Sequence, residues 1–182
     1  DELEELRTRV EKLLKENNDL VREVLKTVKK LNDENRKLVE RILREVERLL
    51  RELREIAKTT SDKDTLKKEL RRVLEEVKKL LEELREHSRR ILETTKELVR
   101  RLEEHSKRVL DTVEDLVRKV VRTEEMRKKA EELRKRVDES VKDTRKKLEE
   151  LRKSTEKSVR DTDRILKDLE RRAREVVDEL EK

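Results

Sequence analysis

Two histidines are the residues of this sequence with the widest chemical repertoire. His87 and His105 are each followed by a serine, Ser88 and Ser106, so the same His-Ser pair occurs twice. A histidine beside a serine could belong to a nucleophilic site, in which the imidazole takes the proton of the hydroxyl. Consecutive residues of a helix point to different faces, however, and a chain without glycine offers no flexible loop for an oxyanion hole. We therefore expect no enzymatic activity and no catalytic residue.

The same histidines could bind a metal ion, because imidazole nitrogens are common ligands. Two histidines separated by five turns of one helix cannot share an ion, since metal–nitrogen bonds are about 2 Å long. The di-iron pattern of helical bundles places a glutamate three residues before the histidine. Those positions hold Leu84 and Leu102, and the chain has no cysteine. We expect no metal site and no cofactor.

Further polar residues repeat with the same spacing as the histidines. The spacing from His87 to His105 is also that from Asn17 to Asn35, from Ser140 to Ser158 and from Thr144 to Thr162. Amide, imidazole and hydroxyl groups carry donors and acceptors that can satisfy one another, and they are costly to bury unpaired. The sequence therefore predicts two copies of a buried hydrogen-bond network that sets helix register. One copy contains Asn17, His105, Ser106, Ser140 and Thr144, and the other contains Asn35, His87, Ser88, Ser158 and Thr162.

The protonation state of the histidines depends on whether they are buried. The alternative to the network is that both lie at the edge of the apolar stripe and face water. In a buried network each imidazole would be neutral, donating one proton and accepting another, and burial would lower its pKa. Asp143 and Asp161 are acids that could oppose this effect if they reach the imidazoles.

Long helices must position these polar residues, because the composition allows little else. The chain has 182 residues, of which 56% are charged, and it contains no Gly, Pro, Phe, Tyr or Trp. Strands and barrels need the turn residues and aromatics that are missing here. Leu, Val and Ile recur at steps of three and four along the chain, which is the helical pattern. Leu31 and Leu98 lie on this apolar stripe and are expected in the core.

Two interruptions divide the periodic pattern into three segments of nearly equal length. The first is the run 59–64, in which Ser61 or Asp62 can cap the next helix, and the second is the run 121–125, in which Thr123 can do so. We expect helices at about 2–59, 64–121 and 124–181. An alternative for the second interruption is one continuous helix over 64–182. The fold class is predicted as all-α, an up-down-up antiparallel three-helix bundle forming one elongated domain over 1–182.

Antiparallel folding at these turns aligns the polar sets. Residues of adjacent antiparallel helices lie side by side when their numbers add up to a constant that the turn sets. Between the first and second helices, the residue numbers of Asn17 and Ser106 have the same sum as those of Asn35 and Ser88. Between the second and third helices, the sum is the same for His105 with Ser140 and for His87 with Ser158. Each set is therefore expected at one height. The repeat length of eighteen makes five turns of 3.6, so very long and nearly straight helices are predicted.

The net charge of +6 raises the possibility of nucleic-acid binding. Acidic and basic residues interleave at helical spacing, as in Glu-Glu-Val-Lys-Lys at 75–79, without a basic block. There is no aromatic residue for base stacking and none for a lipid interface. No apolar run approaches the roughly 20 residues of a membrane span. We expect no nucleic-acid, membrane or small-molecule partner.

Over its whole length the chain resembles computationally designed helical bundles. The resemblance rests on equal idealised helices, Glu/Lys/Arg surfaces, Leu/Ile/Val cores, short capped turns and polar layers such as Glu16-Asn17-Asn18-Asp19 and Glu86-His87-Ser88. It is most similar to designed helical oligomers with buried hydrogen-bond networks, many of which associate as homo-oligomers or heterodimers.

This resemblance implies a synthetic protein with no natural activity or localisation, soluble and compatible with a reducing cytosol. The expected function is that of a structural scaffold whose polar layers set helix register. The alternative is an interaction module that pairs with a further helix, a designed partner or copies of itself. No partner is obligatory under the first interpretation. Under the second, a homo-oligomer or a designed helical partner is expected.

Overall fold

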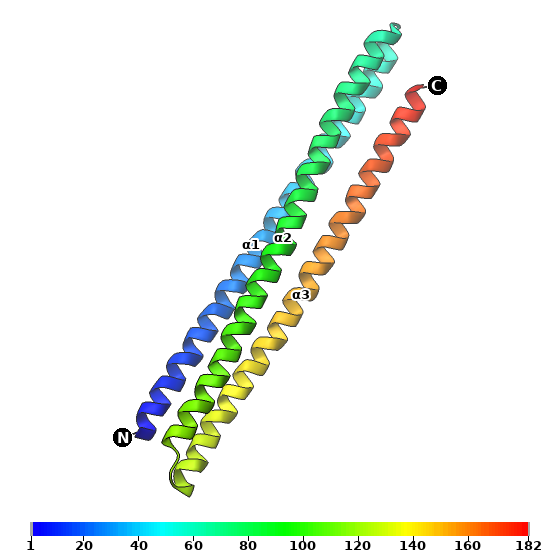
Figure 1. Cartoon of the computed structure of the whole chain (residues 1–182). Coiled ribbons are helices and arrows are strands. Elements are labelled where there is room, and N and C mark those ends of the chain that lie inside the picture. The colour runs from blue at the N-terminus through cyan, green and yellow to red at the C-terminus, as the bar shows by residue number, and fades with distance from the viewer. Residues whose placement is uncertain (1, 182) are drawn as a thin grey trace. The chain divides into compact units, whose positions relative to one another are not determined.

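Three long helices account for nearly all of the chain. The computed structural model describes residues 2–181, in which α1 spans Glu2–Thr59, α2 spans Lys63–Val120 and α3 spans Glu124–Glu181, each with 58 residues. Figure 1 shows the three helices in chain order, and no strand occurs within residues 2–181. The predicted all-α fold of three helices is confirmed. The long helices follow from a composition of good helix formers without Gly or Pro.

Short polar turns end the helices at the two sites that the sequence predicts. Of the two candidate caps for α2, Asp62 is the one used: its Oδ1 accepts a hydrogen bond from the Asp64 N–H at 3.1 Å and its Oδ2 accepts one from Thr65 Oγ1 at 2.8 Å. These two bonds lower the pKa of the Asp62 carboxyl, the Thr65 hydroxyl having the larger effect. Thr123 caps α3 by accepting a hydrogen bond from the Met126 N–H at 3.2 Å. A continuous helix over 64–182 is therefore not present.

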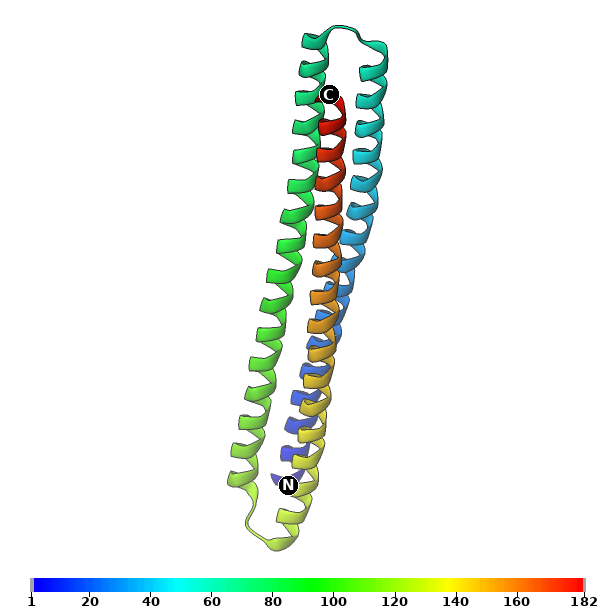
Figure 2. The same ribbon diagram turned by 90° about the vertical axis from the view of Figure 1, so that its right-hand side faces the viewer.

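The chain divides into two compact units, and each helix contributes a segment to both. Unit 1 comprises residues 2–29 and 94–154, and unit 2 comprises residues 30–93 and 155–181. Within each unit, the segments of α1 and α3 run in one direction and that of α2 in the other, as Figures 1 and 2 both show. Each unit is thus a short up-down-up three-helix bundle. The expectation of one domain over 1–182 stays a prediction.

The core of each unit is built from branched aliphatic side chains of all three helices. In unit 1 it contains two clusters, one around Val10, Val113 and Val137 and one around Val28 and Leu102. The single cluster of unit 2 contains, among others, the completely buried Leu53, Leu84, Ile42, Val73 and Leu169. Each fully buried side chain of this size contributes about 1.5–3 kcal/mol by leaving water. Leu31 and Leu98, which the stripe places in the core, are only half-buried.

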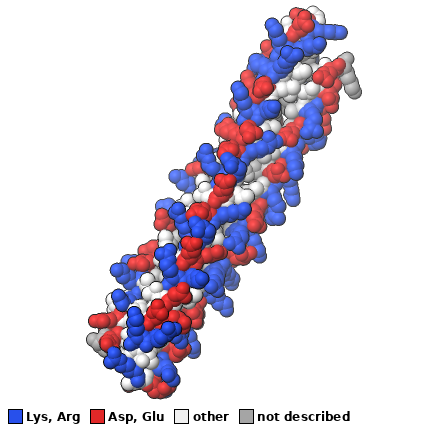
Figure 3. Space-filling model, viewed as in Figure 1, with Lys and Arg blue, Asp and Glu red and all other residues white. Residues whose placement is uncertain are grey.

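The surface is covered with charges of both signs. On the face drawn in Figure 3, Lys and Arg side chains alternate with Asp and Glu, and neither sign forms a continuous patch there. Many charges pair along one helix, as Arg100 does with Glu97 and Glu104, both at 2.7 Å. Others pair between helices, as Arg41 does with Glu83 at 2.6 Å. Exposed pairs of this kind contribute little to stability, because water and salt screen the attraction between the charges.

Candidate functional site: two buried polar layers

Asn17 is the centre of a polar cluster that joins all three helices of unit 1. Its side chain is completely buried, and its Nδ2 donates a hydrogen bond to Thr144 Oγ1 of α3 at 3.1 Å. Its Oδ1 lies 3.1 Å from His105 Nδ1 of α2 and accepts a hydrogen bond from Ser106 Oγ, also at 3.1 Å. Thr144 Oγ1 in turn donates to the carbonyl oxygen of Ser140 at 3.0 Å. We call these five residues the Asn17 layer.

The hydrogen bonds of the Asn17 layer have a single consistent direction. Thr144 gives its only proton to the Ser140 carbonyl, so its oxygen accepts from the amide nitrogen of Asn17. The amide oxygen therefore faces α2, where it can only accept. His105 must then carry a proton on Nδ1, because that nitrogen lies against the amide oxygen. The layer thus selects one imidazole tautomer from the geometry of an asparagine on another helix.

Unit 2 contains the same arrangement around Asn35, one sequence repeat away from Asn17. Asn35 Nδ2 donates to Thr162 Oγ1 at 3.0 Å, and Thr162 Oγ1 donates to the carbonyl oxygen of Ser158 at 2.9 Å. His87 Nδ1 lies 3.2 Å from Asn35 Oδ1 and is the donor for the reason given above. These residues together with Ser88 form the Asn35 layer. Ser88 is buried but, within residues 2–181, has no hydrogen bond to Asn35, so this layer has one bond fewer.

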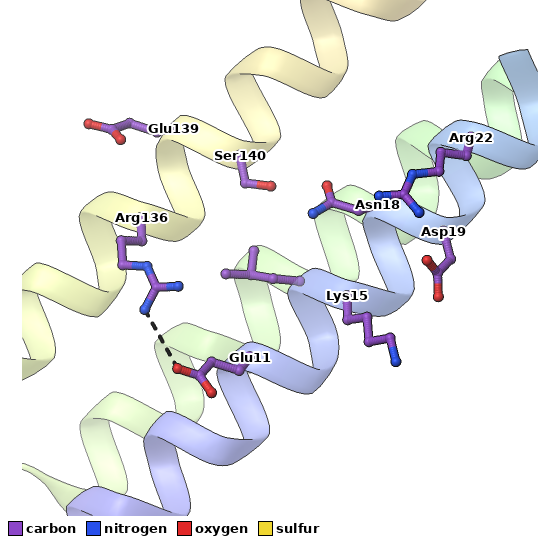
Figure 4. Close-up of a pocket in the computed structure, with 9 residues that line it drawn as sticks. Glu11, Lys15, Asn18, Asp19, Arg22, Arg136, Glu139 and Ser140 are labelled. Carbon is purple, nitrogen blue, oxygen red and sulfur yellow. Dashed lines mark ion pairs between the residues drawn. The ribbon is translucent and has the colours of Figure 1, made fainter.

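The serines of α3 enter the layers differently from the expectation. Ser140 and Ser158 contribute their backbone carbonyls, and neither forms a hydrogen bond with a histidine within residues 2–181. Figure 4 shows the Ser140 side chain pointing into a groove between α1 and α3, opposite Asn18. An ion pair of 3.8 Å between Arg136 and Glu11 crosses this groove. The numerical pairing of residues fixed their height along the helices but not the rotation of each helix about its axis.

His105 is half-buried, and its surroundings favour the neutral imidazole. Its pKa is lowered, mainly because burial removes the charged form from water and also because Arg108 is close, while Glu16 opposes the shift. The acid that opposes the lowered pKa of His105 is thus Glu16 and not Asp143. Asp143 pairs instead with Lys147 at 3.1 Å.

A pH experiment follows from the lowered pKa of His105. Because the folded pKa lies below the unfolded value of about 6.5, this group's contribution to stability is fully present above pH 6.5 and declines as the pH falls through the folded pKa. The Nδ1–H bond to Asn17 survives protonation, since the second proton goes to Nε2, so we expect only a small loss. It should appear as a lower guanidinium midpoint at pH 5.5 than at pH 7.5.

The matched control for this pH experiment is His105→Asn, which cannot titrate in that range. Its midpoint should change less between the two pH values than that of the unchanged chain. Equal changes in both proteins would contradict a lowered pKa at His105.

Some buried polar atoms lie outside the two layers, and the repeated spacing of the polar residues does not predict them. The hydroxyls of Thr95 and Thr155 and the amide oxygen of Asn32 are buried without a hydrogen-bond partner among residues 2–181. Comparing equivalent positions of the sequence repeat would have identified the two threonines. The positions one repeat before and after Thr95 hold Val77 and Val113, and those around Thr155 hold Val137 and Ala173, all of them buried. A threonine in a valine position of the core is the expected source of an unpaired hydroxyl.

Replacing these threonines by valine should stabilise the protein. Thr155 is 1% exposed and Thr95 is 3% exposed, so each hydroxyl has left water without gaining a partner, which costs about 1–3 kcal/mol. Thr155→Val and Thr95→Val keep the shape of the side chain, and we expect each to raise the unfolding free energy by about 1 kcal/mol. Guanidinium unfolding followed by circular dichroism measures this gain.

The control for these two substitutions is Thr144→Val, at a threonine that accepts a hydrogen bond from Asn17. The same chemical change should there lower the unfolding free energy, because it leaves a buried amide proton unpaired. A loss of stability in Thr155→Val comparable to that in Thr144→Val would show that the Thr155 hydroxyl has a partner.

Within residues 2–181, no group of three or more His, Asp or Glu side chains is placed to hold a metal ion. None of the three helices, over the residues described, combines the length and apolar character needed to cross a membrane.

Comparison with known proteins extends the description of the fold. No protein-family model matches the sequence, and no curated protein matches it. Among solved structures, a computationally designed three-helix bundle matches with a TM-score of 0.75 and 23% sequence identity, over 98% of this chain and 90% of that one. The fold is a three-helix bundle. At this identity the comparison concerns the fold alone, and it agrees with the helix count and order described above.

Proposed function

We propose that this protein is a designed structural scaffold with no natural biochemical activity, in which two polar layers specify how the three helices pair. The observation that carries the proposal is the recurrence of one directed hydrogen-bond chain, centred on Asn17 in unit 1 and on Asn35 in unit 2. The similarity to a designed three-helix bundle, the idealised composition and the regular sequence repeat support a synthetic origin.

The polar layers act by penalising wrong packing more than by strengthening the right one. Aliphatic side chains tolerate small rotations of a helix, because dispersion and burial are not directional. If α3 rotated so that Thr144 left the layer, the Asn17 amide would remain buried without an acceptor. Each such unpaired group costs about 1–3 kcal/mol. The turns limit the offset between adjacent helices along their axes, so the layers add discrimination of rotation and partner choice.

The proposal is tested by replacing whole layers with apolar residues. Buried polar groups replaced together by well-packed apolar ones often leave stability unchanged or increased, whereas removing one partner is destabilising. The replacement of the Asn17 layer is Asn17→Leu, His105→Leu, Ser106→Ala and Thr144→Val. That of the Asn35 layer is Asn35→Leu, His87→Leu, Ser88→Ala and Thr162→Val.

We expect the chain with both layers replaced to unfold at the same or a higher guanidinium concentration. Its ¹H–¹⁵N correlation spectrum should show extra or broadened amide resonances, because several packings become similar in free energy. Replacing a single layer serves as the control and should restrict these changes to the unit that contains it. A doubly replaced chain with one sharp set of resonances and an unchanged mass in solution would refute the proposed role of the layers.

A further inference from the structure

The turn between α2 and α3 interrupts the helical hydrogen bonds only briefly, as the turn between α1 and α2 also does. The Val121 N–H still donates to the Val117 carbonyl at 3.0 Å, and the Arg127 N–H already donates to the Thr123 carbonyl at 3.0 Å. Only the N–H groups between them leave the helical pattern. Figure 2 shows this connection as a short stretch between two helix ends.

Neither end of this turn is fixed by a residue that prevents a helix from continuing. Helices commonly stop at a glycine or another residue with positive φ, and no residue described here has positive φ. The turn residues Val121, Arg122 and Thr123 include neither Gly nor Pro, and Arg122 and Thr123 are exposed. Arginine and glutamate, at 122, 124 and 125, are good helix formers.

A continuous helix through this turn would gain backbone hydrogen bonds. The N–H groups of residues 122–125 would donate to the carbonyls of residues 118–121, following the i to i−4 pattern. Residues 118, 119 and 122–125 are exposed in the closed turn, whereas Val120 and Val121 are half-buried. The hydrogen bond from Met126 N–H to Thr123 Oγ1 would be exchanged for one to the carbonyl of residue 122. The closed turn is therefore maintained by the packing of α3, by the Thr123 cap and by the packing of Val121 against the core of unit 1.

We propose that two copies of this chain exchange α3, with α2 and α3 joined into one continuous helix in each copy. A second copy supplies the same α3 surface, so every contact that α3 makes in unit 1 and in unit 2 is remade with the partner. This includes the hydrogen bonds from Asn17 to Thr144 and from Asn35 to Thr162. Apart from the contacts of the turn residues 121–123, the exchanged dimer therefore loses no buried contact, and association is opposed mainly by the entropy of joining two chains.

The turn between α1 and α2 is the internal control, because its residues favour the closed form more strongly. Asp62 forms two hydrogen bonds there, to the Asp64 N–H and to the Thr65 hydroxyl, and a continuous helix would break both. Serine and aspartate, at 61 and 62, are also poorer helix formers than arginine and glutamate. The exchange is therefore expected at the second turn and not at the first.

The experiment compares substitutions that favour the open or the closed form of the second turn. Glu124→Pro places proline at the first position of α3, where it is tolerated, and blocks a continuous helix because proline lacks the N–H and clashes with the preceding turn. Thr123→Ala removes the cap of the closed form. Lys63→Pro makes the matching change at the first position of α2. Each protein is refolded from guanidinium at micromolar and at millimolar concentration, and its mass is measured by light scattering during size exclusion.

The unchanged chain should give a dimer after refolding at millimolar concentration, and that dimer should persist after dilution because its dissociation requires unfolding. Removing a cap changes an equilibrium constant by about five-fold. Because each of the two monomers has this cap and the exchanged dimer does not, Thr123→Ala should raise the association constant about 25-fold. Glu124→Pro should remain monomeric, and Lys63→Pro should form as much dimer as the unchanged chain.

Two results would overturn the exchange. One is a monomer at every concentration for the unchanged chain and for Thr123→Ala. The other is a dimer that Glu124→Pro forms to the same extent, which would indicate association through the surface. Circular dichroism of Glu124→Pro verifies that it is folded, and the comparison of Thr123→Ala with the unchanged chain does not depend on the proline variant.

Discussion

Leu84→Ala is expected to lower the unfolding free energy by about 2–5 kcal/mol, the largest effect of any single substitution considered for this chain. Leu84 is completely buried in the core cluster of unit 2, so the loss combines the transfer of the removed groups with the cavity that remains. Leu102 holds the equivalent place in unit 1, one repeat later in the sequence, and is 2% exposed. Leu102→Ala should have an effect in the same range. Guanidinium midpoints measure both.

The control for these two substitutions is Leu98→Ala, on the same helix. Leu98 is half-buried and lies at the border of the core cluster of unit 1. Its truncation removes side-chain atoms that are still partly in contact with water, so the expected loss is smaller than that of Leu102→Ala. A loss at Leu84 below about 0.5 kcal/mol, which is typical of surface positions, would contradict its placement in the core.

Asn17→Ala is expected to lower the unfolding free energy by about 2–4 kcal/mol, because it leaves buried partners without hydrogen bonds. The His105 Nδ1–H and the Ser106 hydroxyl both lose their acceptor, and Ser106 is 3% exposed. Thr144 keeps its bond to the Ser140 carbonyl and adds little to the loss.

Asn35→Ala is the matched comparison, because the Asn35 layer has one hydrogen bond fewer. Only the His87 Nδ1–H loses an acceptor there, and that imidazole is half-buried. The expected loss is about 1–2 kcal/mol. Urea or guanidinium titrations of the two variants give the order directly. A larger loss for Asn35→Ala than for Asn17→Ala would contradict the hydrogen bonding described for Ser106.

Much of the fold follows from the sequence, because helix periodicity and turn positions are local properties. The two turns, the cap at Thr123 and the set of three helices were all predictable from capping residues and from the absence of Gly and Pro. The choice of Asp62 over Ser61 as the cap of α2 was not, because both residue types cap helices well.

The sequence repeat indicates which polar residues recur, but it does not give the hydrogen bonds that they form. The repeat spacing identifies the asparagines, and the structure joins them to the predicted histidines and threonines. Spacing does not determine which atom of a side chain faces its neighbour. The spacing therefore did not predict that Ser140 and Ser158 contribute their backbone carbonyls. It also did not predict that each histidine donates through Nδ1 instead of both donating and accepting within the layer.

The unpaired threonines show a different limit of sequence reasoning. Thr95 and Thr155 lie on the apolar face, where a β-branched residue of valine shape fits, and the repeat places valine or alanine at the equivalent positions. A search for polar residues that recur overlooks those that occur once. Comparing each position with its equivalents in the neighbouring repeats would have identified both.

The tautomer of His105 shows whether a polar layer joins the three helices, and it does so without the other contributions that enter a stability measurement. The ¹⁵N chemical shifts of the imidazole at pH 7.5 report which nitrogen carries the proton, and solvent exchange reports whether that proton is protected. The layer predicts a protonated Nδ1 that exchanges slowly in the unchanged chain and loses this protection in Asn17→Ala. A proton on Nε2 that exchanges rapidly, with no difference between the two proteins, would contradict the layer.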